Sequence, residues 1–342
     1  MSTAPHGGGA RYVVGIDLGT TNSAVAWAEP GRGRAVSVFP VPQLAGEGEV
    51  RARDTLASAV YLAGEHDVPP GALALPWRGD ERFAVGAYAR RLGARVAGRL
   101  VTSAKSWLCH GGVDRDARIL PWGGAPDAPR LSPVEASSRI VEHLRDAWDA
   151  AHPGERLAEQ DVVLTVPASF DEVARELTVR AAEAAGLARI RLLEEPQAAI
   201  YAWIAAHADW RERLAGVRLV LVVDVGGGTT DFSLVAVRRG ADGLALERVA
   251  VGDHLLLGGD NMDIALARRV ADRSAAGGLD AARWQQLVDQ CREAKERLLG
   301  DDPPESVAVS IAGRGRGVVA GAIGGALAAS EALEVVREGF FP

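Results

Sequence analysis

The sequence has almost no lysine, only two cysteines and no long apolar run, and each shortage excludes something. Cys109 and Cys291 form no CxxC pair and have no histidine cluster nearby, so we expect reduced thiols and no zinc site. No apolar run is long enough to span a membrane. Residues 1–11 lack the apolar segment of a signal peptide and are expected to form a flexible tail. These features predict a cytoplasmic protein.

Positively charged residues are fewer than negatively charged ones. The formal net charge is −7 and no basic stripe interrupts the sequence, so neither nucleic acid nor a membrane is expected as a partner. Hydrophobic residues make up 48% and charged residues 24%, which is ordinary for a soluble protein. A chain of 342 residues is long enough for two lobes, each with its own core.

Lysine is the most informative shortage. Lys and Arg together number 38, yet the only lysines are Lys105 and Lys295. A compact ammonium cannot be replaced freely by a planar guanidinium, so the two positions that keep lysine are candidate functional sites. Chance retention is the alternative for so small a number.

The chain is organised around the stretch Ile16–Ser23. An apolar run, 12–16, predicts a buried strand that ends at Asp17, and a second run, 24–28, follows Gly19, Thr20, Thr21 and Asn22. Glycine lets backbone approach an anion, and hydroxyls and turn amides can donate to phosphate. A carboxylate beside phosphate requires a cation, so Asp17 predicts Mg²⁺. Taken alone, the stretch also fits an ordinary turn.

Several elements are expected between this hairpin and residue 212. Residues 34–41 are expected to be a further strand, and residues 43–130 a smaller subdomain with a helix over 82–99, followed by Lys105. Ser132, Pro133 and Glu135 predict a capped helix start. Strands are expected at 161–167 and 190–193, and a helix at 197–207.

The helix expected after residue 167 has a predicted cap and a predicted apolar face. Ser169 or Asp171 is the candidate cap, and Gly186 is the candidate end. The expected apolar face comprises Val173, Leu177, Ala181 and Ala184. Glu194, beside Glu195, is expected to be an exposed turn residue.

The pattern of a strand ending in Asp, a turn rich in Gly and Thr, and a second strand occurs again later in the chain. A run expected to be a buried strand, 217–223, ends at Asp224, and Gly226-Gly227-Gly228-Thr229-Thr230-Asp231 leads into another strand. A third strand at 244–251 and helices near 262–274 and 280–299 are expected to follow. An internal repeat of this kind predicts a duplicated, two-lobed α/β fold whose hairpins face each other across a cleft.

These two hairpins and the segments between them resemble one family. The blocks that carry the resemblance are VVGIDLGTTNSAVA at 13–26, LLEEPQAAIYAW at 192–203, VVDVGGGTTDFSLV at 222–235 and LGGDNMD at 257–263. The chain resembles the nucleotide-binding domain of DnaK-type seventy-kilodalton heat-shock chaperones, over about residues 12–300 and weakly over 43–130. The resemblance implies an actin-like, ribonuclease-H-like duplicated ATPase fold with a subdomain on each lobe.

The resemblance also implies roles for individual residues, with ATP or ADP and Mg²⁺ as cofactors. Asp17 and Asp224 would hold Mg²⁺ through water, and Lys105 would lie near the γ-phosphate and the attacking water. Glu195 and Asp231 would orient water or metal. The implied phosphate and nucleotide contacts are Gly19, Thr20, Thr21, Asn22, Gly226, Gly227, Gly228, Thr229, Gly258, Gly259, Asp260 and, on the adenosine side, Lys295.

The implied lobes have definite boundaries. Residues 12–42 and 131–212 would form the core of the first lobe, with 43–130 as its subdomain. Residues 213–252 would form an incomplete core of the second lobe, with 253–342 as its subdomain.

The sequence departs from the family in two places. Arg292 stands where the family has a glutamate, and Glu296 where it often has an arginine or isoleucine, which leaves the adenine contacts open. The resemblance ends before the family's later adenosine loop, linker and peptide-binding domain, so we expect a fragment or a truncated product.

Three functions are compatible with these features. The leading one is a Mg²⁺-dependent ATPase module of a chaperone, whose clients and co-chaperones would act on the full-length protein. A small-molecule kinase of the sugar-kinase type and a non-catalytic interaction module that has lost nucleotide affinity are the alternatives.

Overall fold

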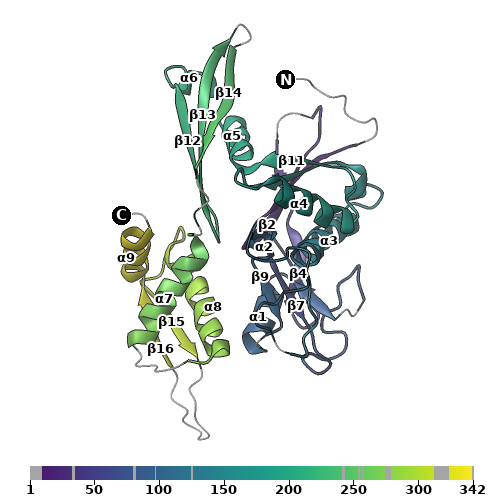
Figure 1. Ribbon diagram of the computed structural model, residues 1–342, viewed down its shortest axis with the longest axis vertical. Coiled ribbons are helices and arrows are strands. Elements are labelled where there is room, and N and C mark those ends of the chain that lie inside the picture. Colours follow the sequence, from purple (N-terminus) through teal and green to yellow (C-terminus); the bar gives the residue numbers. More distant parts are fainter. Residues whose placement is uncertain are drawn as a thin grey trace, which may run out of the picture.

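The computed structural model describes residues 10–340 except 33–34, 80–81, 97, 125, 241–242, 253–254, 256, 274–278 and 312–322. Most of the flexible tail expected at residues 1–11 lies outside this range. The chain combines mixed sheets with helices, consistent with an α/β fold, and Figure 1 shows them in two bodies joined near α5 and β12. None of the described helices combines the length and the apolar character needed to cross a membrane.

The first body is built on a six-stranded mixed sheet. Its strands are β1 (Val13–Leu18), β2 (Asn22–Ala28), β3 (Ser37–Val38), β6 (Leu56–Ala57), β10 (Asp161–Val166) and β11 (Ile190–Glu194), in the order β11-β10-β1-β2-β3 with β6 on β2. β1 runs parallel to β10 and antiparallel to β2, with Asp17 opposite Ala24. The strand expected at 34–41 is therefore only two residues long, at β3. The parallel strands bring the ends of β1 and β10 to the same edge of the sheet, where Asp17 and Thr165 meet.

Helix α3 (Pro133–Ala151) covers this sheet and supplies much of its core. The predicted cap is confirmed: the backbone N–H of Glu135 donates to Ser132 Oγ (3.1 Å), and Glu135 Oε2 accepts from the Ser132 N–H (2.8 Å). Trp148 and Ile140 of α3 pack with Ile16 of β1 in one buried cluster. A short 3₁₀ turn (Leu157–Glu159) then leads into β10.

Residues 41–108 form further strands and helices beside this sheet. These are the hairpin β4 (Val41–Gly46) and β5 (Glu49–Arg53), the sheet β8-β7-β9 (Phe83–Val85, Ala59–Leu62, Leu100–Thr102), and the helices α1 (Ala87–Arg95) and α2 (Ala104–Leu108). The helix expected over 82–99 is thus too long. Phe83–Val85 pairs with β7 as a strand, and Gly86, at φ 99°, separates that strand from α1.

Helices α4 (Glu172–Ala184) and α5 (Glu195–Ala206) follow β10 and β11. Asp171 caps α4, as one of the two predicted alternatives, and Gly186 follows its end at φ 85°. The predicted apolar face of α4 is partly wrong: Leu177 and Ala181 are buried, but Val173 is 52% exposed and Ala184 is also exposed. Ala174 and Thr178 take the buried positions instead, because the packed face lies one residue further along the helix.

The second body begins after the short helix α6 (Trp210–Arg213) with a three-stranded antiparallel sheet. Its order is β12 (Leu219–Val225), β13 (Thr230–Gly240) and β14 (Gly243–Val251). The strand predicted at 217–223 is present, at β12, but the prediction that it is buried is wrong. Alternate side chains of β12, at Leu219, Leu221, Val223 and Val225, are 40–58% exposed, and those between them are half-buried.

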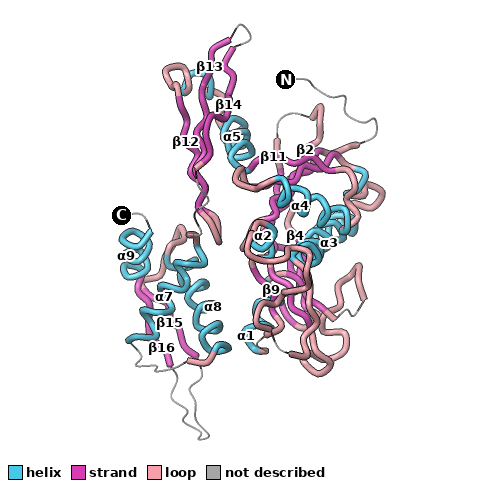
Figure 2. The backbone as a smooth tube through the Cα atoms, in the orientation of Figure 1, coloured by secondary structure: helices cyan, strands magenta, loops and turns pink. Residues whose placement is uncertain are grey.

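The remainder of the second body has its own core. Helices α7 (Gly259–Arg273), α8 (Ala281–Leu298) and α9 (Ala329–Phe340) pack with the hairpin β15 (Ser306–Ile311) and β16 (Ile323–Ala328). Leu266, Leu287 and Leu327 lie in this cluster, which shares no residue with the core around α3. Figure 2 shows these helices and the hairpin grouped below the sheet β12-β13-β14.

Candidate functional site

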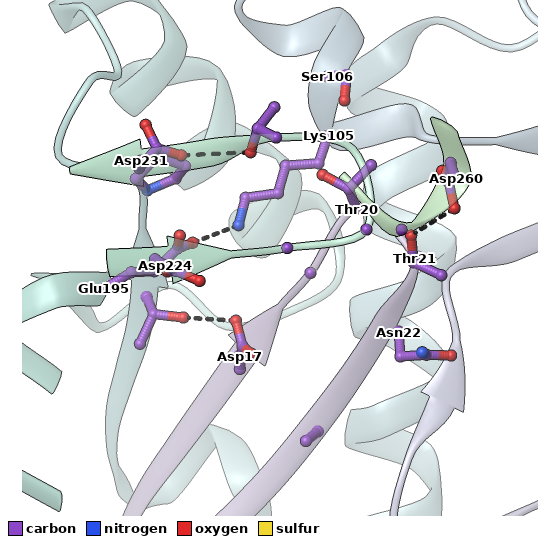
Figure 3. A pocket seen from close by; sticks show the side chains of 18 of the residues that line it. Asp17, Thr20, Thr21, Asn22, Lys105, Ser106, Glu195, Asp224, Asp231 and Asp260 are labelled. Carbon is purple, nitrogen blue, oxygen red and sulfur yellow. Dashed lines mark hydrogen bonds and ion pairs between the residues drawn. The ribbon is translucent and has the colours of Figure 1, made fainter. Parts of the chain in front are cut away.

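A cavity of about 750 Å³ lies between the two hairpins. It contains fifteen of the seventeen residues that the sequence nominates: Asp17, Gly19, Thr20, Thr21, Asn22, Lys105, Glu195, Asp224, Gly226, Gly227, Thr229, Asp231, Gly259, Asp260 and Lys295. The other two, Gly228 and Gly258, do not line the cavity but lie against residues that do. Figure 3 shows the charged members converging on one space from separate elements.

The first wall of the cavity is the β1–β2 hairpin. Asp17 is the last but one residue of β1, and its Oδ1 accepts a hydrogen bond from Thr165 Oγ1 of β10 (2.9 Å). Gly19 follows at the tip, where a Cβ would lie 2.1 Å from the carbonyl oxygen of Asn22. Only glycine fits that turn without displacing the backbone, and the turn aims the Thr20–Asn22 segment into the cavity.

The opposite wall is the β12–β13 hairpin. Asp224 and Asp231 are paired across its two strands, and the Gly226 N–H donates to the Thr229 carbonyl (2.8 Å) to close the turn. Ser169 Oγ donates to Asp231 Oδ1 (3.1 Å), and Thr229 Oγ1 donates to Asp231 Oδ2 (3.3 Å). The Ser169 bond joins this hairpin to the loop after β10.

The two hairpin tips touch. A Cβ on Gly227 would lie 1.7 Å from Thr21 Oγ1, and one on Gly228 would lie 2.9 Å from Thr20 Cγ2. A Cβ on Gly258 would lie 2.6 Å from the carbonyl oxygens of Gly226 and Gly227. The three loops can therefore meet only because these three positions carry no side chain. Glycine is needed here for the close approach and not for an unusual φ angle.

Lys105 and Glu195 form an ion pair at the floor of the cavity. Lys105 lies in α2, which begins after Ser103 in the left-handed region (φ 54°), a conformation that costs an L-residue about 1–2 kcal/mol. The Lys105 residue is only 7% exposed. Burial raises the pKa of Glu195, and the nearby Asp17 and Asp224 raise it further, while Lys105 opposes the shift. The ammonium thus offsets repulsion among three carboxylates.

Asp224 is also held where its charge is unfavourable. Burial raises its pKa, and the neighbouring Asp231 and Asp17 act in the same direction. Two carboxylates that repel across a cavity are the kind of donor set that a hard cation stabilises. The described residues contain no group of three or more possible protein ligands. Mg²⁺ usually keeps several waters, so two carboxylates acting through water fit it.

The far end of the cavity holds an ion-pair network that the sequence only partly predicts. Lys295 Nζ lies 2.7 Å from Asp263 Oδ1 and donates to the Gly259 carbonyl (2.8 Å). Arg292 pairs with Asp263 (2.7 Å) and with Asp260 (2.9 Å). Asp260 Oδ1 accepts from Thr21 Oγ1 (3.2 Å), which connects the network to the first hairpin.

Sequence reasoning missed four of these residues as members of the site. Asp263 lies within the LGGDNMD block and is almost fully buried, and Thr165 lies in the predicted strand before Pro167, so both were within reach. Ser169 was considered only as a helix cap. Arg292 was noted as a departure, and its salt bridges could not be inferred from its position in the chain.

Glu194 corrects a further prediction. It is not an exposed turn residue: it ends β11, its side chain is 12% exposed, and it pairs with Arg175 of α4 (2.9 Å) and Arg248 of β14 (3.1 Å). The adjacent Glu195 therefore begins α5 at a point fixed by both bodies.

Comparison with known proteins identifies the family. Residues 119–311 match the model of the family described as Hsp70 protein. The chain is 32% identical over 313 residues to a chaperone protein HscA homolog of Aeromonas hydrophila, covering 88% of this chain and 44% of that protein. It is 34% identical over 294 residues to a chaperone protein HscA homolog of Pseudomonas putida, covering 85% and 43%. The chain thus spans somewhat under half the length of these relatives, and over that span it belongs to the Hsp70 family, in the region of the nucleotide-binding domain.

Proposed function

We propose that this chain is a Mg²⁺-dependent ATP-binding and ATP-hydrolysing module of a DnaK-type chaperone. The observation that carries the proposal is the meeting of two Asp-Gly-Thr hairpins in one cavity, with a buried lysine between their carboxylates. Family membership supports nucleotide as the ligand.

The proposed architecture is a two-lobed, duplicated actin-like fold. The first lobe comprises 12–42 and 131–212 with the subdomain 43–130, and the second comprises 213–252 with the subdomain 253–342. The repeat of the β1–β2 hairpin in β12–β13 and the separate cores of the two bodies support it. Clients, co-chaperones and a cytoplasmic location belong to this proposal as properties of the full-length protein.

In the proposed reaction the protein positions and neutralises rather than forming covalent bonds. The amides and hydroxyls at Thr20–Asn22 and Gly226–Thr229 hold the β- and γ-phosphates. Asp17 and Asp224 would hold Mg²⁺ through water, and the metal would neutralise charge on the phosphate oxygens. Lys105 stabilises charge on the transferred phosphoryl group, and Glu195, with its raised pKa, orients the attacking water.

Replacement of Lys105 tests the chemistry. Lys105→Ala should lower the rate of single-turnover ATP hydrolysis by about 100-fold or more, because it removes the ammonium that contacts the phosphoryl group in the transition state. The dissociation constant for Mg·ATP should change by less than about threefold. Hydrolysis is measured by rapid quench and binding by isothermal titration calorimetry, with Arg268→Gln on the outer side of α7 as a control that should leave both unchanged.

Several outcomes would contradict the proposal. No heat on titration of the wild-type chain with millimolar Mg·ATP would favour the interaction module. Equal loss of binding and hydrolysis in Lys105→Ala would make Lys105 structural rather than catalytic. Turnover that rises sharply when a sugar is added would favour the kinase.

A further inference from the structure

A second cavity, of about 780 Å³, lies between α1 of the first body and α8 of the second. It adjoins the nucleotide cavity, because Asn22, Arg292 and Glu296 line both. In Figure 1, α1 and α8 face each other below the hairpin tips. The Nε2 of Gln286 on α8 donates to the Ala94 carbonyl on α1, so the two helices are already in contact at one point.

The lining of this cavity is rich in arginine although the chain as a whole is acidic. Three carboxylates face it, from Asp289, Glu293 and Glu296. Six arginines face it as well: Arg53, Arg90, Arg91, Arg95, Arg292 and Arg297. The surplus of three positive charges contrasts with a net charge of −7 for the whole chain.

Most of these guanidinium groups have no described carboxylate within ion-pair distance. In the described part of the chain, five of the six form no ion pair; only Arg292 does, with Asp260 and Asp263. Arg90 is largely buried: it donates to the Thr21 carbonyl, and its Nε has no hydrogen-bond partner. Burial first, and then the proximity of Arg292, lower the pKa of Arg90, while Asp260, Asp289 and Glu296 oppose the shift.

The geometry suits a compact anion. Arg90, Arg91 and Arg95 reach the cavity from α1, and Arg297 reaches it from α8, so an anion between the helices would contact both bodies. Guanidinium groups recognise phosphate through paired N–H donors, and the volume is that of a small-molecule pocket.

We propose that this cavity binds a small polyphosphate, either free or carried by a nucleotide, which bridges α1 and α8 beside the nucleotide cavity. Bound in this way it would supply the partners that the unpaired arginines lack. It would also hold Thr21 in place through Arg90, and so couple this cavity to the first hairpin.

The test uses inorganic tripolyphosphate and removes one exposed arginine from each side of the cavity. Tripolyphosphate is titrated into the whole chain without nucleotide. Wild type should bind one equivalent, and Arg95→Gln/Arg297→Gln should bind at least about tenfold more weakly, because two charge-assisted contacts are lost. The matched control, Arg268→Gln/Arg337→Gln, removes two exposed arginines that lie outside the cavity and form no ion pair among the described residues, and should bind as wild type does.

Competition with ATP distinguishes a free polyphosphate from one carried by a nucleotide. Binding of tripolyphosphate should persist after one equivalent of Mg·ATP has filled the nucleotide cavity; displacement by that first equivalent would place the anion in the nucleotide cavity and overturn the proposal. If a second equivalent of ATP binds to wild type and is lost only in Arg95→Gln/Arg297→Gln, the ligand is a polyphosphate carried by a nucleotide. If the cavity binds tripolyphosphate but no second equivalent of ATP, the ligand is a free polyphosphate. The proposal would be overturned if that variant bound tripolyphosphate with unchanged affinity. It would also be overturned if wild type bound a hexa-aspartate peptide but not tripolyphosphate. If ATP does not bind at all, the comparison of the two double variants still decides it.

Discussion

At the scale of single residues, Asp224 is held in a position that favours ligand binding over stability. Its pKa is raised above the ordinary value of 3.8, first by burial and then by Asp231 and Asp17. At pH values between the ordinary pKa, which holds in the unfolded chain, and the raised pKa of the folded chain, the folded chain keeps a proton that the unfolded chain has released. Stability therefore falls as pH rises through that window and remains lower above it.

Asp224→Asn should remove this loss. We expect the free energy of unfolding without Mg²⁺ or nucleotide to rise by about 1 kcal/mol at pH 7, and the gain to shrink as pH falls toward 4. Urea unfolding at a series of pH values measures this, and Mg²⁺ dependence of nucleotide binding should weaken in parallel. Equal stability of the two proteins at pH 7 would show that Asp224 carries no such penalty.

Gly227 is the second residue whose replacement should be diagnostic. An added Cβ would meet Thr21 Oγ1 at 1.7 Å and Thr21 Cβ at 2.4 Å, so the hairpin tips would have to separate. Overpacking of this kind costs about 1–3 kcal/mol. Gly227→Ala should therefore weaken Mg·ATP binding roughly tenfold to hundredfold by calorimetry. Gly216→Ala, where an added Cβ meets nothing within 4 Å, is the control and should bind normally.

The sequence nominates the residues at the hairpin end of the cavity directly and those of the far end only in part. The Asp-Gly-Thr pattern carries its chemistry in adjacent positions, so Thr20, Thr21 and Gly227 could be nominated directly. The network of Arg292 and Asp263 joins residues 29 positions apart on two helices. Spacing alone gives no sign of which cation each carboxylate takes, so such pairs depend on the packing of α7 against α8.

At the scale of elements, β12 shows what an apolar pattern leaves undetermined. A continuous run such as LVLVVDV predicts a strand buried on both faces. In the described chain one face meets α5, where Val220 and Val222 lie near Ile200 and Trp203, and the other is exposed. Hydrophobicity predicts the strand, but whether a second layer covers it depends on distant segments.

One substitution made at two positions tests this asymmetry. Val223 on the outer face of β12 is 48% exposed, and Val235 on β13 is 3% exposed. Val223→Thr should change the free energy of unfolding by less than about 0.5 kcal/mol. Val235→Thr should lower it by about 1–3 kcal/mol, because it buries a hydroxyl. Chemical denaturation compares them, and an equal loss would mean that the outer face is covered in solution.

At the scale of the whole molecule, two separate apolar cores are joined through polar contacts and through the apolar contact of α5 with β12. The cluster around α3 and the cluster among α7, α8 and α9 have no residue in common. Between the bodies lie the hydrogen bond from Thr21 to Asp260, the ion pair of Glu194 with Arg248, and the contact of Gln286 with Ala94. An interface this limited allows domains to move relative to each other.

Calorimetry should separate the two bodies and nucleotide should couple them. Without ligand we expect two resolved unfolding transitions. Mg·ADP at about 100 times its dissociation constant should stabilise the folded chain by about 2.7 kcal/mol and merge the transitions into one at higher temperature, since the ligand contacts both hairpins. A single two-state transition without nucleotide would show that the bodies already unfold as one unit.

The two lysines make selective chemical labelling of the cavity possible. Both line the same cavity, and the remaining cations of the chain are guanidinium groups, which acylating reagents do not modify at neutral pH. Apart from the N-terminal amine, every primary amine of this chain therefore lies at the candidate site. Reagents that label most proteins across their surface would here act as a local footprint, reporting whether the cavity is open, closed or filled.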